Sequence, residues 1–300
     1  MQSLAKIFYL GVVCDLNKKL LTLIIGGIFL IALAACSKTT APTETNSADV
    51  DPSENMNEAS ELNLPELFKK TEEANNKLES FSLHMDLTQT FDVDGQEMNI
   101  NSDLTLHIIT DPFRMKQTMI LEHGDLGEQE METYVVEDGV FLFEPEQEEW
   151  LKFPKEVSDD IIHLSESQTE LGNQIIQFEE FVDDISIDQE DNYYVLSLNA
   201  TGDQFNEMLT ETIKNSMPQE FGFEEDISNH LHFDHAEYEI GIYKNSFHFA
   251  YLDVIMNYEM DIEGEKIQVQ QDIQSTYSEH NEIKEITVPQ DVIDNAIEID

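Results

Sequence analysis

The spacing of apolar residues changes once in the first part of the folded chain. Between residues 64 and 78 they recur at intervals of three and four, which predicts an amphipathic helix. From residue 81 the interval falls to two, the period of a half-buried strand. Two such runs, 81–93 and 96–108, flank Asp94-Gly95, a pair favoured in two-residue hairpin turns. The spacing therefore predicts a helix followed by one long hairpin.

A two-residue turn at Asp94-Gly95 also fixes the register of that hairpin. It brings apolar residues opposite one another, pairing 91 with 98, 85 with 104, 83 with 106 and 81 with 108. A slip of one residue would move every apolar side chain to the other face. The same reasoning around Glu263-Gly264 pairs 260 with 267, 258 with 269 and 254 with 273. Both ends of the folded chain are thus predicted to be long apolar-faced hairpins.

Further alternating runs predict a meander of strands between the two hairpins. They cover 113–122, 129–136, 140–143, 150–153, 193–198, 232–243 and 247–262. Residues 157–182 are predicted to be mainly helical, and a capping box at 201–204 predicts another helix after it. This order is typical of one α+β domain with a large curved antiparallel sheet and helices covering one face.

The first 62 residues do not share these periods. An apolar run of 13 residues, 20–32, follows two lysines and is shorter than the roughly 20 residues that span a bilayer. It ends in Leu33-Ala34-Ala35-Cys36, which resembles the lipobox of bacterial lipoproteins. The resemblance implies cleavage between Ala35 and Cys36 and acylation of Cys36, which would anchor the protein to the outer side of the cell membrane.

This interpretation divides the chain into three parts. Residues 1–35 are a signal peptide, 36–62 are a lipidated N-terminus with a disordered acidic linker, and 63–300 are one folded domain. The whole chain has 15 basic and 63 acidic residues. Residues 1–35 hold three lysines and one aspartate, which leaves 12 basic and 62 acidic residues and a net charge of −50. Such a charge excludes ordinary binding to nucleic acid, which needs basic side chains to neutralise phosphates.

A family resemblance follows from these residues together. The lipobox, the acidic linker, "LPELFKKTEEANNKLESFSLHMDLTQTF" and "VVEDGVFLFEPEQEEWLKFP" resemble an uncharacterised family of Gram-positive surface lipoproteins. The order of elements is also similar to that of LolA-type lipoprotein carriers and the related LppX-like proteins. That second resemblance implies a half-barrel closed by helices, with lipid bound inside. It rests on pattern alone, and a shared fold does not establish a function.

The sequence gives little support for an enzymatic function. It contains no GxSxG elbow, Walker loop, GxGxxG or HExxH motif, and we expect a protein that is not an enzyme and has no cofactor. The stretch "HLHFDH" would place His230, His232 and Asp234 on one face of a strand, with His235 on the other. These are weak metal ligands by pattern, and an exposed strand is the favoured interpretation, so no metal site is predicted.

Two functions from different classes remain. The first is an extracytoplasmic binding protein that carries or senses an apolar ligand or lipid between sheet and helices. The alternative is an interaction protein with a packed core and a protein partner at the cell envelope. The candidate ligand-lining residues are the apolar positions of the two hairpins: Phe81, Leu83, Met85, Met98, Leu104, Leu106, Met256, Tyr258, Met260, Ile267 and Val269. Methionine is frequent among them, and its flexible thioether suits adaptable apolar surfaces.

Overall fold

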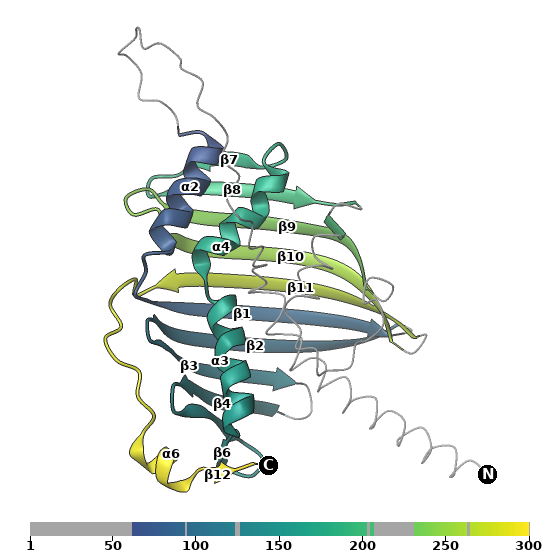
Figure 1. Cartoon of the computed structure of the whole chain (residues 1–300). Helices are drawn as coiled ribbons and strands as arrows, with labels where there is room; N and C mark the ends of the chain where they lie inside the picture. The colour runs from purple at the N-terminus through teal and green to yellow at the C-terminus, as the bar shows by residue number, and fades with distance from the viewer. Residues whose placement is uncertain are drawn as a thin grey trace, which may run out of the picture.

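One twelve-stranded sheet dominates the molecule (Figure 1). The computed structural model describes residues 62–299, except 94, 124–126, 203–204, 207–230 and 263–264. The strands lie in the order β12-β6-β5-β4-β3-β2-β1-β11-β10-β9-β8-β7. Every neighbouring pair is antiparallel except β12 and β6, which are parallel. The first and last hairpins of the sequence meet at the centre of the sheet, where β1 pairs with β11.

The strands vary widely in length. The long central ones are β1 (Ser80–Val93), β2 (Gln96–Thr110), β11 (Glu265–Ser278), β10 (Phe249–Ile262) and β9 (Leu231–Tyr243). The others are β3 (Phe113–His123), β4 (Gly127–Val136), β5 (Gly139–Glu144), β6 (Glu149–Lys152), β7 (Ser186–Gln189), β8 (Tyr193–Ala200) and β12 (Ile297–Glu298). The longest strands therefore occupy the middle of the sheet and the shortest stand at its edges.

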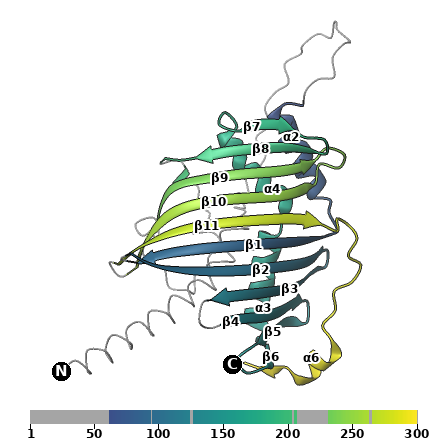
Figure 2. The same cartoon turned by 180° about the vertical axis from the view of Figure 1, so that it is seen from behind.

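The helices that precede β7 in the chain lie on one face of this curved sheet. In Figure 1 they cross in front of the strands, and from behind the strands stand in front of them (Figure 2). They are α2 (Leu64–Asn75), α3 (Lys155–Gln168) and α4 (Leu171–Ile176), which continues as a 3₁₀ turn, η2 (Gln177–Phe181). The predicted fold class is confirmed: an α+β protein with a large, unclosed, curved sheet and helices on one face.

The predicted register is confirmed in both hairpins. Phe91 lies opposite Met98 and Met85 opposite Leu104, as the turn at Gly95 requires. In the second hairpin Tyr258 lies opposite Val269 and the other two predicted pairs also form. Alternation of apolar and polar residues was sufficient here because only one face of each strand is buried against the core.

Helix α2 starts where its sequence provides a cap. The Asn63 side chain accepts a hydrogen bond from the backbone N–H of Glu66 at 3.0 Å, and a proline stands in the first turn. At the other end the Asn75 side chain donates to the Phe247 carbonyl at 3.1 Å and accepts from the Phe249 N–H at 3.3 Å. These bonds tie α2 to the turn before β10, so its end is fixed to the sheet.

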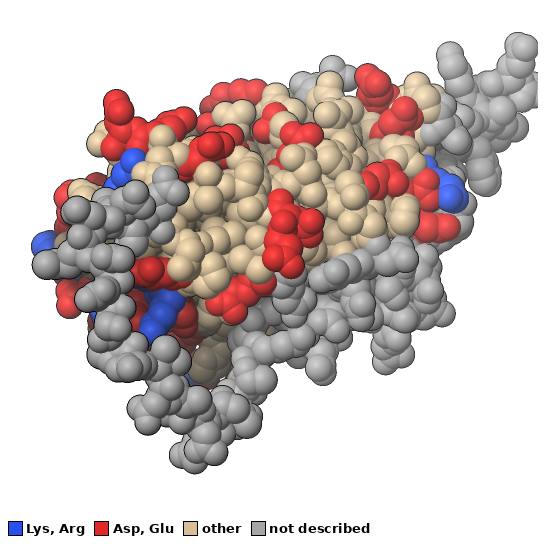
Figure 3. Space-filling view, turned by 90° about the horizontal axis from the view of Figure 1, so that it is seen from above, with Lys and Arg blue, Asp and Glu red and all other residues tan. Residues whose placement is uncertain are grey.

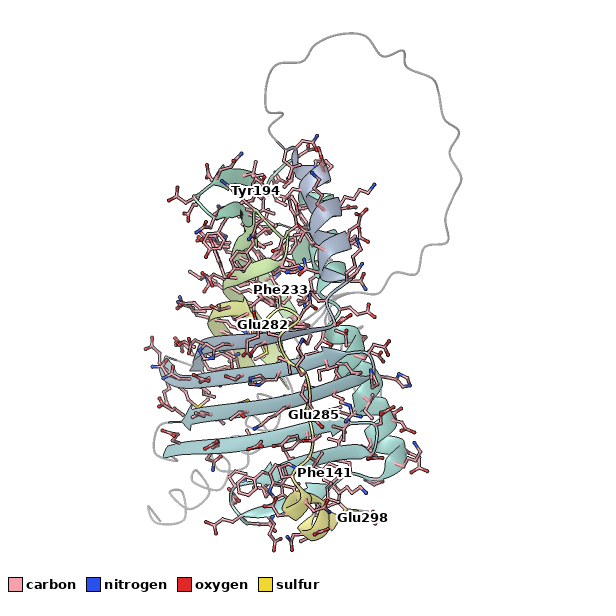
Figure 4. The ribbon with its side chains drawn as sticks, turned by 90° about the vertical axis from the view of Figure 1, so that its left-hand side faces the viewer. Phe141, Tyr194, Phe233, Glu282, Glu285 and Glu298 are labelled. Atoms are coloured by element: carbon pink, nitrogen blue, oxygen red, sulfur yellow. The ribbon has the colours of Figure 1, made fainter. Side chains whose placement is uncertain are left out.

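The C-terminal segment packs on the opposite face. After β11 the chain runs past the ends of the strands to α6 (Gln290–Asn295) and β12, and Figure 4 shows Glu282 and Glu285 along this path. Ile286 and Val292 form a second small core with Tyr134, Val136 and Phe141. This segment closes one end of the outer face.

Several elements were not expected. Strands β7 and β12 and helix α6 are only four, two and six residues long, too short for a periodic signal. The helical region at 157–182 is divided between α3 and α4 around Thr169, whose backbone N–H and hydroxyl both bond to carbonyls of the last turn of α3. The helix expected after residue 204 falls almost wholly outside the described residues.

Candidate functional site: the inner face of the sheet

The inner face is the face of the sheet that the helices cover. All eleven candidate ligand-lining residues lie on it, and the two predicted apolar faces join there into one surface. Nine of them belong to one buried core, with exposed fractions between 0 and 5%. Met98 and Met260 are partly buried and pack against that core. Whether these residues bind a ligand remains a prediction.

Methionines recur across this surface from one side of the sheet to the other. Met85, Met115, Met119 and Met256 are buried in the core. A further three, Met98, Met131 and Met260, pack against it. Unbranched thioether side chains fill irregular gaps and repack at low cost. The inner face is therefore more adaptable than one built only from β-branched residues.

Four polar residues interrupt the apolar pattern at the centre of the inner face. Gln89, Ser102, Gln271 and Ser275 occupy inward positions on β1, β2 and β11, and each is at most 5% exposed. Gln89 lies directly opposite Gln271. Each of the four has a side-chain atom without a hydrogen-bond partner among the described residues: Gln89 Oε1, Ser102 Oγ, Gln271 Nε2 and Ser275 Oγ. Such atoms are rare in folded proteins and call for an explanation.

Two buried tyrosines stand beside these polar residues. The Tyr258 hydroxyl donates to Gln271 Oε1 at 3.5 Å, and the Tyr277 hydroxyl donates to Gln174 Oε1 on α4 at 3.4 Å. Burial raises the pKa of both hydroxyls far above its ordinary value, so both stay protonated and act as donors. Tyr277 thus links a helix to the sheet, and Tyr258 orients the amide of Gln271.

The polar residues could have been noticed in the sequence. Each stands at a position where the period-two pattern calls for an apolar residue, between Leu87 and Phe91 or between Val269 and Ile273, for example. A gap in a periodic pattern is a weak signal, because an isolated polar residue at such a position is often exposed at the end of a strand. Only the pairing of β1 with β11 brings Gln89 and Gln271 together.

The described residues of the "HLHFDH" stretch, 231–235, lie at the start of β9. His232 Nε2 lies 3.6 Å from Asp234 Oδ1, and both side chains are more than half exposed. The prediction that His235 points to the opposite face is wrong. A register shift between 233 and 235 inserts one extra residue, so the outward His235 bonds to Glu237 at 2.8 Å while Phe233 and Ala236 are buried. His230 lies outside the described residues.

Another group on the outer face has the composition of a metal site. His84, Asp86 and Asp103 each offer a ligand atom, and these atoms lie within 4.8 Å of one another. His84 Nε2 is 3.6 Å from Asp86 and its Nδ1 is 3.7 Å from Asp103. The imidazole therefore lies between the two carboxylates.

Acidic side chains are spread over the described surface. Seen from above, Asp and Glu are scattered across it, and Lys and Arg stand near its two ends (Figure 3). None of the described helices is both long enough and apolar enough to cross a membrane.

The chain belongs to a family of unknown function, DUF6612, whose model matches residues 63–297. This match spans the predicted folded domain almost completely. No curated protein sequence matches the chain.

Solved structures give weaker similarities. LprF from Mycobacterium bovis is 10% identical, with 75% of this chain and 94% of that one covered and a TM-score of 0.33. A putative outer membrane lipoprotein-sorting protein domain from Vibrio parahaemolyticus is 8% identical, with 70% and 88% covered and a TM-score of 0.24. MucB in complex with MucA(peri) is 8% identical, with 70% and 55% covered and a TM-score of 0.21. Because every TM-score is below 0.5, we draw no function from these structures.

Proposed function

We propose that this protein is a lipid-anchored, extracytoplasmic binding protein that holds an acyl lipid between the inner face of its sheet and its helices. The observation that carries the proposal is the largely apolar surface across β2, β1, β11 and β10, which is rich in methionine and faces the described helices. We propose in addition that the protein is not an enzyme, on the ground that its sequence contains no GxSxG elbow, Walker loop, GxGxxG or HExxH motif.

Anchoring at Cys36 is a separate part of the proposal. It rests on the Leu33-Ala34-Ala35-Cys36 motif, which lies outside the described residues. In cells fed labelled palmitate, the wild-type chain should incorporate label and Cys36→Ser should not, with its signal peptide retained. Equal labelling of Cys36→Ser would contradict lipidation at this residue.

The bound ligand would replace part of the contact between helices and sheet. The lining side chains are almost fully buried, so a ligand enters only where the helices separate from the inner face. Flexible methionines would then repack around acyl chains without leaving voids. The same close burial is what a packed-core interaction protein would show, and this observation favours the second candidate function.

Photocrosslinking in cells separates the two functions. Cells that make the full chain are fed a fatty acid with a photoreactive group, irradiated, and the purified protein is mapped by peptide mass spectrometry. We expect crosslinks on peptides from β1, β2, β10 and β11, in addition to acylation at Cys36. Crosslinks confined to Cys36 would contradict ligand binding on the inner face.

Two matched variants sharpen this experiment. Leu104→Glu places a carboxylate on the inner face, whereas Asn101→Glu places one on the exposed face of the same strand. We expect Leu104→Glu to lose most of the inner-face crosslinks and Asn101→Glu to keep them. A buried unpaired charge costs several kcal/mol, so circular dichroism must show that Leu104→Glu is folded. Undiminished crosslinking of a folded Leu104→Glu chain would contradict the proposal.

A further inference from the structure

The buried amides at the centre of the inner face point to the chemical class of the ligand. Gln89 and Gln271 are 4% and 0% exposed and lie opposite each other on β1 and β11. Gln89 Oε1, an acceptor, and Gln271 Nε2, a donor, both lack a partner in the part of the chain that the structure describes. Leaving such buried groups unpaired is unfavourable. The centre of the apolar face thus presents one free acceptor beside one free donor.

We propose that Gln89 and Gln271 form the polar subsite for a neutral, hydroxyl-bearing lipid such as a monoacylglycerol. This rests on the proposed function and names its ligand class. A single hydroxyl accepts from Gln271 Nε2 and donates to Gln89 Oε1, which satisfies both amides at once. A carboxylate or an ester offers only acceptors and leaves Gln89 Oε1 unpaired.

The residues at the inward strand positions also favour a neutral ligand. The inward positions of β1 (81–93), β2 (98–108), β10 (252–260) and β11 (267–277) contain no Asp, Glu, Lys or Arg. An anionic head group would therefore be buried without a partner of opposite charge, which is strongly unfavourable. A neutral head group avoids that penalty.

The surroundings of the two amides fit this role. Tyr258 is a positioning residue, because its hydroxyl donates to Gln271 Oε1 and leaves Nε2 as the free end of that amide. Ser102, also buried and without a partner among the described residues, lies on β2 opposite Leu87, two positions along β1 from Gln89. Ser102 therefore extends the polar subsite to a third strand, where a second hydroxyl of a head group would meet it.

Competition among three lipids with the same acyl chain tests the proposal. The full chain in detergent micelles is offered equal concentrations of 1-monooleoylglycerol, methyl oleate and oleate, and retained lipid is measured by native mass spectrometry. We expect monooleoylglycerol to be retained at least about tenfold over the other two, which corresponds to about 1.4 kcal/mol. Equal retention of all three would overturn the polar subsite and leave the proposed function standing.

Variants of Gln89 and Gln271 test whether the preference for monooleoylglycerol depends on their side-chain amides. Gln89→Met with Gln271→Met should lower retention of monooleoylglycerol to that of methyl oleate, whose own retention should not fall. Gln117→Met is the matched control. Gln117 is a buried glutamine on β3 that lies level with Leu83, six residues along β1 from Gln89, so the two glutamines are roughly 20 Å apart. Unchanged preference in the double variant would show that the two amides are satisfied by each other or by a water molecule. Retention of none of the three lipids by the folded wild type would instead contradict the proposed function itself.

Discussion

At the scale of single residues, burial lowers the pKa of two histidines, His248 and His280, at one end of the strands. The rings of His248 and His280 lie 4.8 Å apart, and Tyr243 meets His280 edge-on at 6.1 Å. Burial, followed by the nearby His248, lowers the pKa of His280 to about 4, and burial also lowers that of His248. His280 is therefore neutral in the folded protein at pH values where an unfolded chain would protonate it.

The sign of the resulting pH dependence follows from linkage. Between about pH 6.5 and 4 the unfolded chain binds a proton at His280 that the folded chain does not, so stability falls as pH falls through this window. We expect His280→Leu to flatten that part of the melting-temperature profile. Ser167→Ala, which replaces a side chain that does not titrate at an exposed position on α3, is the control and should leave the profile unchanged. A profile of His280→Leu parallel to the wild type would contradict this account.

Individual residues also show which side-chain positions could be predicted from the sequence and which could not. Phe81, Met85 and Tyr258 were placed on the inner face correctly because each stands in a long run of alternating apolar and polar residues. His235 was placed on the wrong face because a β-bulge adds one residue and leaves no mark in the apolar pattern. Gln89 and Gln271 became a candidate site only through pairing between strands that are 182 positions apart.

At the scale of elements, the pairing of β9 with β10 places a tyrosine ring of β10 directly over a glycine of β9. Gly241 lies opposite Tyr251, and a Cβ on Gly241 would come within 2.1 Å of the Tyr251 ring. The same ring donates from its hydroxyl to Glu239 at 3.0 Å and meets Tyr193 edge-on. The glycine therefore makes room for an aromatic ring that crosses the outer side of the pair.

Gly241→Ala tests this cross-strand contact. The added methyl forces the Tyr251 ring away, and overpacking of this kind costs roughly 1–3 kcal/mol. In a Tyr251→Ala background the clash is gone, and an alanine in a strand is favoured over glycine by roughly 0.5–1 kcal/mol. Urea denaturation should therefore show that Gly241→Ala destabilises the wild type and stabilises Tyr251→Ala. Destabilisation of equal size in both backgrounds would contradict the packing.

The elements were predicted unevenly. The two central hairpins followed from apolar spacing and turn residues, including their registers. The division of residues 155–181 into α3, α4 and η2 depends on local bonds around Thr169 that apolar spacing does not report. The two edge strands β7 and β12 form only because a longer neighbour is already in place, so tertiary pairing rather than local pattern determines them.

At the scale of the whole molecule, the first and last hairpins build the centre of one sheet from opposite ends of the folded chain. This arrangement joins two apolar faces into the inner face, which neither hairpin provides alone. The fold class could be predicted from the sequence because the long strands carry strong patterns. The join between β1 and β11, on which the candidate site depends, could not, because no short segment of sequence specifies which distant strand it pairs with.

The central claim is that this inner face carries a lipid in the cell. The most direct measurement is quantitative mass spectrometry of non-covalently bound lipid, extracted with organic solvent from the full chain after purification from the cells that made it. The account predicts close to one acyl lipid per folded chain, in addition to the acyl groups that remain attached to Cys36. A folded chain that releases no lipid would contradict the account and favour an interaction protein with a packed core.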